Sequence, residues 1–184
     1  TRHPLPEPFM VVATQNPIEY EGTYPLPEAL LDRFFFKVLI EYPAAEEEKA
    51  IVMRYHEGFD AHRLESLGLE PVMAGPDLEA LRRECRSVAV GEDVVEYVTA
   101  LVRASRSSRD VLLGASPRAA IALLLGCKAL AAIQGRAYVL PDDVKRLAPP
   151  ILRHRLLLKP EAEIEGLTPD LVIQKLLASV EVPR

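Results

Sequence analysis

Apolar runs alternate with turn-forming residues in the N-terminal part of the chain. Residues 9–14 (FMVVAT) form a continuous apolar run that begins after Pro8 and ends at a polar stretch closed by Pro17. A short run of this kind is typical of a strand buried on both faces, as in a parallel sheet. Residues 34–40 (FFFKVLI) repeat the pattern, and a short helix is expected over about residues 27–33. The pattern therefore predicts a strand, a helix and a second strand.

Helical periodicity dominates the rest of the chain. Residues 44–59 predict a helix with glutamates in its first turn, where the helix dipole favours negative charge. Residues 59–76 contain turn residues and no regular period, which indicates a linker. After the linker, apolar residues recur at helical spacing, as Val94, Val98 and Leu101 do. Further helices are predicted over residues 77–85, 91–107, 116–134, 140–156 and 167–180.

These elements predict two parts of different fold class. Residues 1–58 form an α/β part, residues 59–76 a linker, and residues 77–184 an all-α helical domain, so that the fold is mainly α. Two strands and two helices cannot cover both faces of a parallel sheet. We therefore expect residues 1–58 to be the remnant of a larger α/β domain.

Composition and charge narrow the range of functions. The formal net charge is −5 at pH 7, which argues against a nucleic-acid-binding helical domain, as does the lack of aromatic residues on which bases could stack. Cys85 and Cys127 lack the spacing of a disulfide framework or a zinc site, and the histidines are scattered, so no metal site is predicted. The longest apolar run, residues 121–133, is interrupted by Lys128 and is too short for a membrane span. With no signal sequence at the N-terminus, we expect a cytoplasmic protein.

Asn16 is the first candidate for chemistry. It follows the first predicted strand, and ligands of open α/β sheets bind beyond the carboxyl ends of the strands. A neutral amide at this place can donate a hydrogen bond to a phosphate oxygen or orient a water molecule. Asn-Pro is also ordinary turn chemistry, and for this residue alone the turn is the simpler interpretation.

Arg33 is the second candidate, at the end of the predicted helix and among leucines and phenylalanines. A guanidinium at the edge of an apolar surface can reach across an interface to the nucleotide of a neighbouring subunit. The alternative is a local role, because a cation suits the C-terminal end of a helix and the adjacent Asp32 can pair with it. The residues alone leave both interpretations open.

Arg118 is the third candidate. Ser116-Pro117 is typical of a helix start, with serine as the N-cap and proline at the first helical position. Arg118 then lies in the first turn, where the helix dipole disfavours a positive charge by about 0.3–1 kcal/mol. A nearby anion would explain this arginine, whereas the alternative is a long side chain that extends into water. Upstream arginines either widen this positive face or form a solvated helix edge: Arg103, Arg106 and Arg109.

The motifs that would complete a nucleotide site are absent from the sequence. No GxxxxGK[ST] phosphate-binding loop occurs, and no apolar strand ends in an Asp-Glu pair that could hold Mg²⁺. Residues 138–143 (YVLPDD) imitate such a strand, but Pro141 makes Asp142 and Asp143 part of a helix cap. No motif of a serine hydrolase, a zinc protease or a cysteine nucleophile is present either.

Three segments in this order carry a resemblance to a known family. They are residues 13–34 (ATQNPIEYEGTYPLPEALLDRF), residues 114–119 (GASPRA), and residues 136–156 (RAYVLPDDVKRLAPPILRHRL) with the following EIEGLTPD. Together they resemble the C-terminal part of a MoxR-family AAA+ ATPase, over essentially the whole chain. The resemblance implies the end of a P-loop AAA+ core followed by a helical lid domain. It also implies that Asn16 is sensor 1, that Arg33 is an arginine finger acting on the next subunit, and that Arg118 is the sensor 2 arginine, acting in cis or in trans.

The resemblance further implies cofactors and partners. These are ATP and Mg²⁺, a homo-oligomeric ring that is usually hexameric, and a chaperone-like role in the maturation of, or metal-cofactor insertion into, a client enzyme. A von Willebrand factor A domain protein is a common partner in such systems. In the family, the P-loop and the magnesium-binding acids precede sensor 1, whereas this sequence begins after both. We therefore expect a shortened chain or an incomplete gene model that neither binds ATP tightly nor hydrolyses it alone. The alternative is a catalytically inactive regulatory module that docks onto intact subunits.

Overall fold

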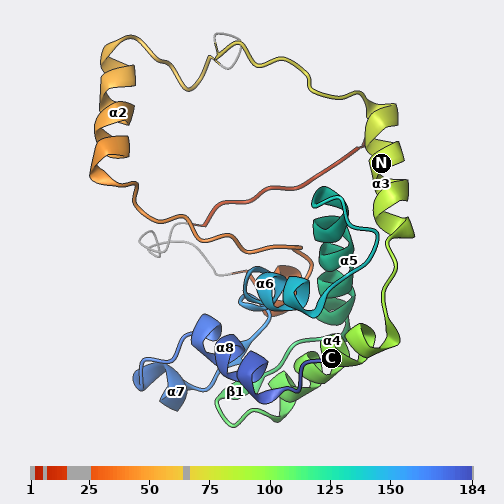
Figure 1. The fold of residues 1–184 in the computed structure, drawn as a ribbon. Helices are drawn as coiled ribbons and strands as arrows, with labels where there is room; N and C mark the ends of the chain where they lie inside the picture. Colours follow the sequence, from red (N-terminus) through yellow and green to blue (C-terminus); the bar gives the residue numbers. More distant parts are fainter. Residues whose placement is uncertain (1–2, 6–7, 16–25, 64–66, 184) are drawn as a thin grey trace. The chain divides into compact units, whose positions relative to one another are not determined.

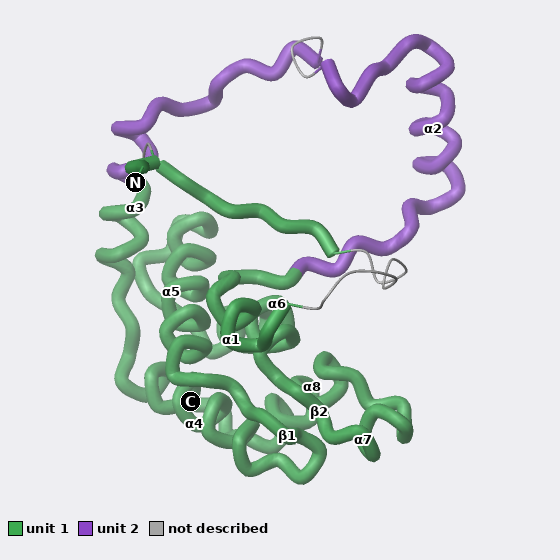
Figure 2. Tube along the Cα trace, turned by 180° about the vertical axis from the view of Figure 1, so that it is seen from behind, with its two compact units in different colours: residues 1–37, 81–184 green, residues 38–80 purple. Residues whose placement is uncertain are grey.

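The structure is a computed structural model that describes residues 3–5, 8–15, 26–63 and 67–183 (Figure 1). The described part is mainly helical, which confirms the predicted fold class at this level. The chain divides into two compact units: unit 1 comprises residues 1–37 and 81–184, and unit 2 comprises residues 38–80 (Figure 2). The domain boundaries that the sequence predicts, at residues 58 and 77, stay a prediction.

Unit 2 contains α2 (Ala45–His56) and the beginning of α3 (Gly75–Ser87). The glutamates lie in the first turn of α2 as predicted, and the Glu47 carboxylate also caps the helix by accepting a hydrogen bond from the N–H of Ala44 at 3.1 Å. Asp77 caps the start of α3 in the same way. No residue of α2 is buried. Local capping therefore defines where these helices begin.

Unit 1 is built on helices, most of which begin where the sequence pattern predicts. Proline occupies the first turn of α5, α6, α7 and α8, where its missing N–H costs nothing. The pattern did not predict α7, because so short a helix shows no period. The bounds are α1 (Glu28–Leu31), α4 (Glu92–Ser107), α5 (Pro117–Ile133), α6 (Pro141–Leu152), α7 (Pro160–Ile164) and α8 (Pro169–Ser179).

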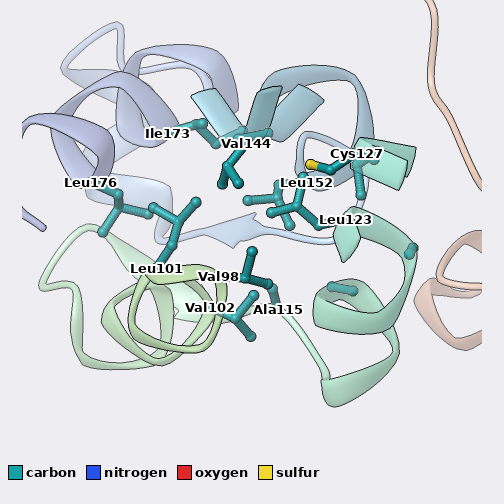
Figure 3. Packing of buried hydrophobic residues seen from close by; sticks show 14 of the residues in the cluster. Val98, Leu101, Val102, Ala115, Leu123, Cys127, Val144, Leu152, Ile173 and Leu176 are labelled. Carbon is teal, nitrogen blue, oxygen red and sulfur yellow. The ribbon is translucent and has the colours of Figure 1, made fainter. Parts of the chain in front are cut away.

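Side chains from α4, α5, α6 and α8 fill one apolar core (Figure 3). Leu101 of α4, Leu123 of α5 and Ile173 of α8 are completely buried, and Val144 of α6 lies among them. The apolar positions that recur along residues 91–107 are the ones that face this core. Burying one such side chain stabilises the fold by about 1.5–3 kcal/mol, so the core provides a rigid base for the loops that it carries.

A two-stranded antiparallel ribbon joins distant parts of unit 1. β1 (Val111–Leu113) pairs with β2 (Leu157–Leu158), with Val111 opposite Leu158. The all-α domain expected over residues 77–184 therefore includes a small ribbon, which is too short to show the alternation of a strand in the sequence. The helix predicted to extend to residue 156 ends at Leu152, because two consecutive prolines deprive its last turn of N–H donors.

The strands predicted at residues 9–14 and 34–40 are not formed. Both segments run without a partner strand among the described residues, and Val12 and Ile40 are 77% and 92% exposed. In the second segment, the N–H of Lys37 donates to the carbonyl of Pro150 in α6 and not to a neighbouring strand. A strand needs a neighbour for its backbone hydrogen bonds, and the described residues provide none. Apolar sequence alone could not reveal this, because it reports side-chain burial and not backbone pairing.

Candidate functional site

Asp32 lies at the C-terminal end of α1, where the N-terminal segment of unit 1 contacts the helical part. Its carboxylate accepts a hydrogen bond from Arg155 Nε at 3.0 Å, and the hydroxyl of Ser116 donates to both carboxylate oxygens at 3.1 Å. Arg118 Nη1 lies 3.5 Å from the same carboxylate. Since α1 has no buried residue of its own, these polar contacts fix its position.

Arg155 is the buried cation of this site, with a side chain that is only 2% exposed. Besides the carboxylate, its guanidinium donates to the backbone carbonyls of Asp32 at 3.1 Å, Phe34 at 2.5 Å and Phe35 at 3.2 Å. It also donates to the carbonyl of Ile151 in its own helix region. Burial lowers the pKa of Arg155, and the hydrogen bond and charge of Asp32 raise it. An arginine stays protonated in proteins, so the site holds a buried positive charge with acceptors at each nitrogen.

Two neighbours of Arg155 hold the same segment. Arg153 Nη1 donates to the carbonyl of Lys37 at 3.1 Å, and His154 Nε2 lies 3.0 Å from the carbonyl of Phe34. Arg153 is itself oriented by Asp170 of α8, at 3.0 Å. We call Arg153, His154 and Arg155 the RHR clamp, because all three bind backbone carbonyls within residues 32–37. Apart from the Asp32 carboxylate, the clamp thus binds the backbone after α1 and not its side chains.

The loop before α5 places Arg118 beside Asp32. Gly114 is required there, because a Cβ at this position would lie 2.7 Å from the backbone of Arg106. The N–H of Ala115 donates to the hydroxyl of Ser105 at 3.0 Å, and Arg106 Nε donates to the Ala115 carbonyl at 2.8 Å. α4 therefore holds this loop by both backbone groups of one residue, and α5 begins at a fixed point.

Ser116 and Arg118 lie where the sequence predicts, at the N-cap and in the first turn of α5. The hydroxyl of Ser116 makes no capping bond, however, and donates to Asp32 instead. The anion expected near Arg118 is Asp32. The distance between the two side chains is long, at 3.5 Å, and the Arg118 side chain is 56% exposed. An exposed ion pair of this kind contributes about 0–1 kcal/mol, so Arg118 is only weakly held.

Arg33 follows Asp32 and is exposed. Its N–H donates to the carbonyl of Leu30 in the turn that ends α1. Among the residues that the structure describes, its guanidinium has neither a hydrogen-bond partner nor an ion-pair partner. The alternative in which Asp32 pairs with Arg33 is therefore wrong, since Asp32 pairs with Arg155 and Arg118. Arg33 extends from a turn that is fixed on both sides.

The third predicted site residue, Asn16, lies outside the described residues. The structure therefore places Arg118 beside Asp32, the residue before Arg33 in the chain, and says nothing of Asn16. Asp143 caps α6 as predicted: it accepts from the N–H of Leu140 at 2.8 Å and from Arg136 at 2.6 Å. Within the described ranges, no three potential ligands gather to hold a metal ion, and no helix there is long and apolar enough to cross a bilayer.

Comparison with known proteins assigns the two sides of this site to two family models. Residues 1–36 match the model of the ATPase family associated with various cellular activities (AAA), and residues 103–176 match the AAA lid domain. The chain is 38% identical to chaperone MoxR1 of Mycobacterium tuberculosis over 98% of its length. The chain belongs to the MoxR family of AAA+ ATPases.

Two further proteins are similar to this chain at comparable identity. The chain is 44% identical to the uncharacterised protein YeaC of Bacillus subtilis over 97% of its length. A crystal structure from Cytophaga hutchinsonii, described as a presumptive ATPase, is 37% identical, covers 99% of this chain and superposes with a TM-score of 0.87. The chain covers 54% of YeaC, 48% of MoxR1 and 56% of the Cytophaga protein, which is about half of each.

In this MoxR-family chain, sequence reasoning missed Asp32 and Arg155 as site residues. Three consecutive basic residues at the end of a helix ordinarily form a solvated surface, so nothing in the string RHR indicates a buried arginine. The one signal of a buried cation was Asp32 at the end of α1. An acid is unfavourable at a helix C-terminus, so its presence there indicates a cationic partner. That signal gives the charge of the partner but not its position in the sequence.

Proposed function

We propose that this chain is the part of a MoxR-family ATPase that senses ATP and promotes its hydrolysis. Arg33 acts as the arginine finger for the ATP of a neighbouring subunit, Asn16 as sensor 1 and Arg118 as sensor 2. The support is the state of the two described arginines: Arg33 is exposed and without an ionic partner in the described part, and Arg118 is exposed and weakly paired. Both are available for an anionic ligand.

The chemistry follows from the charge that develops during phosphoryl transfer. Negative charge spreads over the oxygens of the transferred phosphoryl group, and a guanidinium placed beside them stabilises it. Arg33 would supply that charge, and the neutral amide of Asn16 would orient the attacking water without adding charge. ATP brings its phosphates and Mg²⁺ to the site. The described residues form no metal-ligand cluster, so the Mg²⁺ would be held by residues outside them.

One contact carries the assignment of the two arginines to a common nucleotide: Arg118 lies 3.5 Å from Asp32, the residue before Arg33. Arg33 follows Asp32 in the chain without pairing with its carboxylate, so both exposed arginines adjoin the same turn after α1. Since an arginine finger reaches the nucleotide of the next subunit, Arg118 would act in trans as well. Arg118 would exchange its weak ion pair with Asp32 for one with a phosphate, which carries more negative charge.

The role of the full-length protein is a proposal from its relatives. One of them is a chaperone by name, MoxR1 of Mycobacterium tuberculosis. We propose that the full protein forms a homo-oligomeric ring, hexameric as is usual for such ATPases, and uses ATP to remodel client proteins. Maturation of a client enzyme or insertion of its metal cofactor, together with a von Willebrand factor A domain protein, is the specific form of this proposal.

The test is an ATPase assay on a full-length chimera, in which the preceding segment of YeaC is joined to residues 1–184. Arg33→Ala and Arg118→Ala are compared with Arg109→Ala, an arginine that is 90% exposed and forms an ion pair with its neighbour Asp110. We expect Arg33→Ala to lower kcat on the order of 10²–10³-fold, as removal of one charge-stabilising donor does. Arg109→Ala should leave kcat unchanged.

Mixing experiments then test the action in trans. Subunits carrying Arg33→Ala or Arg118→Ala are mixed with subunits whose P-loop lysine is replaced. Recovery of ATPase activity in both mixtures is expected, because each intact arginine would then serve the neighbour's intact nucleotide site. Recovery for Arg33→Ala alone would place Arg118 in cis. A chimera that assembles but hydrolyses ATP equally well without Arg33 would favour the inactive regulatory module.

A further inference from the structure

The turn that carries Arg33 has few means of holding its own position. It follows α1, which has only four residues, none of them buried. A helix this short does not form independently in water, because the first turn fixes several residues for one hydrogen bond. Whatever fixes Arg33 in space must therefore come from outside residues 28–36.

Arg155 provides most of that fixation. Its acceptors in the turn are the Asp32 carboxylate and the carbonyls of Asp32, Phe34 and Phe35, which lie on both sides of Arg33. The remaining acceptor is the carbonyl of Ile151, close to Arg155 in sequence, which ties the guanidinium to α6. With a side chain that is 2% exposed, Arg155 has no access to water that could replace these bonds.

The planar guanidinium is essential to this arrangement. Its nitrogens form a rigid fork that can meet several acceptors at once, whereas lysine presents a single ammonium group on a flexible stem. Lysine at this position would keep the charge and the pairing with Asp32 but could not bridge the carbonyls before and after Arg33. The geometry of the turn thus depends on the guanidinium and not on positive charge alone.

We propose that Arg155 is a positioning residue for the arginine finger: it clamps the backbone around Arg33 onto the lid, so that the finger and the lid move as one body. This inference rests on the proposed function of Arg33. It assigns to the lid a role in setting the reach of the finger toward the neighbouring subunit. A lid that shifts with its own nucleotide would then carry Arg33 with it.

The test is a double-mutant cycle in the full-length chimera, with Arg155→Lys, Arg33→Ala and the combination of both. Misplacement of a catalytic group by about 1 Å can cost about 10²-fold in rate, so we expect Arg155→Lys to lower kcat by up to that factor with little change in KM for ATP. In the Arg33→Ala background, Arg155→Lys should lower kcat no further, because it acts only through the finger.

Arg136→Lys is the matched control. Arg136 also binds a carboxylate and a backbone carbonyl, those of Asp143 and Tyr138, and its side chain is 20% exposed. It lies in the lid region, and its hydrogen bonds in the described part of the chain go to Tyr138, Asp143 and Gln134 and not to residues 32–37. Arg136→Lys should weaken the lid without lowering kcat, which separates positioning of the finger from general stability.

The outcomes separate this inference from the proposed function. If Arg33→Ala leaves kcat unchanged, the finger itself is wrong. If Arg33→Ala lowers kcat but Arg155→Lys leaves it unchanged, or lowers it further in the Arg33→Ala background, the positioning role is wrong. Should Arg155→Lys prevent assembly, Asp32→Asn gives the same cycle with one charged acceptor removed, and additivity with Arg33→Ala would again refute the inference.

Discussion

Replacing Asp32 by asparagine in the chain of 184 residues tests the buried ion pair directly. Asparagine has nearly the same shape and keeps one acceptor oxygen, so the change removes charge and little else. Asp32 is the carboxylate in contact with Arg155, at 3.0 Å, and the guanidinium is 2% exposed. The variant therefore leaves a positive charge buried without its counter-charge. We expect a lower free energy of unfolding for the helical part of unit 1.

The magnitude follows from the burial of both partners. Breaking a fully buried ion pair by removing one member costs about 3–5 kcal/mol. Here Asp32 is 21% exposed, and Arg155 retains carbonyl acceptors at Phe34, Phe35 and Ile151. We therefore place the loss at about 2–3 kcal/mol, below that range. For a chain of this size it corresponds to a fall in Tm of roughly 4–12 °C.

Urea unfolding followed by far-UV circular dichroism measures this loss, since the chain has no tryptophan to report by fluorescence. Asp110→Asn is the control: the same chemical change removes the partner of Lys175 and Arg109, whose side chains are 54% and 90% exposed, and should cost no more than about 1 kcal/mol. Amide exchange at residues 33–37 should also accelerate in Asp32→Asn alone. A loss no larger than that of the control, with unchanged exchange at residues 33–37, would refute the reasoning.

The remaining predictions concern other parts of unit 1. Gly114→Ala should lower the free energy of unfolding by about 1–3 kcal/mol in urea, because its Cβ would meet the backbone of Arg106 at 2.7 Å; a neutral result would contradict that clash. Burial raises the pKa of Cys127 to about 12, so at pH 8 a thiol reagent should label Cys85 in the folded chain and both cysteines only in urea; equal labelling rates would contradict this burial. Burial, with Arg155 and Lys37 nearby, lowers the pKa of His154 below 6.5, so the folded state binds fewer protons than the unfolded state and loses stability as pH falls through 6.5. The difference in urea midpoint between the wild type and His154→Gln should therefore change from pH 7 to pH 5.5, and a constant difference would refute the sign.

Helices were largely predictable from this sequence, because their signals are local. The glutamates at the start of α2, Ser116-Pro117 before α5 and Pro141 in α6 act within one turn of their own helix. The strands were not predictable. The apolar runs at residues 9–14 and 34–40 have no partner strands among the described residues, whereas β1 and β2 form from short segments with no visible period. Pairing depends on two distant segments at once, and a local pattern carries only half of that information.

The candidate site divides in the same way. The position of Arg118 in the first turn of α5, and its need for an anion, could be read from the sequence. That Asp32 would be the anion could not, because the two residues are far apart along the chain and meet only through the tertiary fold. Arg155 was hidden for a further reason: its partners are mostly backbone carbonyls, which leave no trace in the sequence.

Helix ends explain why basic residues gather at residues 153–155. The last carbonyls of a helix have no partner within it and carry partial negative charge. α1 ends at Leu31 and α6 ends at Leu152, and the carbonyls beyond the first end and before the second converge on the RHR clamp. A cation placed there satisfies the Ile151 carbonyl at the end of α6 and the carbonyls of the segment that follows α1, and Asp32 completes the balance of charge. Apart from the Asp32 carboxylate, the clamp joins the two segments through backbone carbonyls, so the side chains after Arg33 are free to serve an interface without loosening the turn.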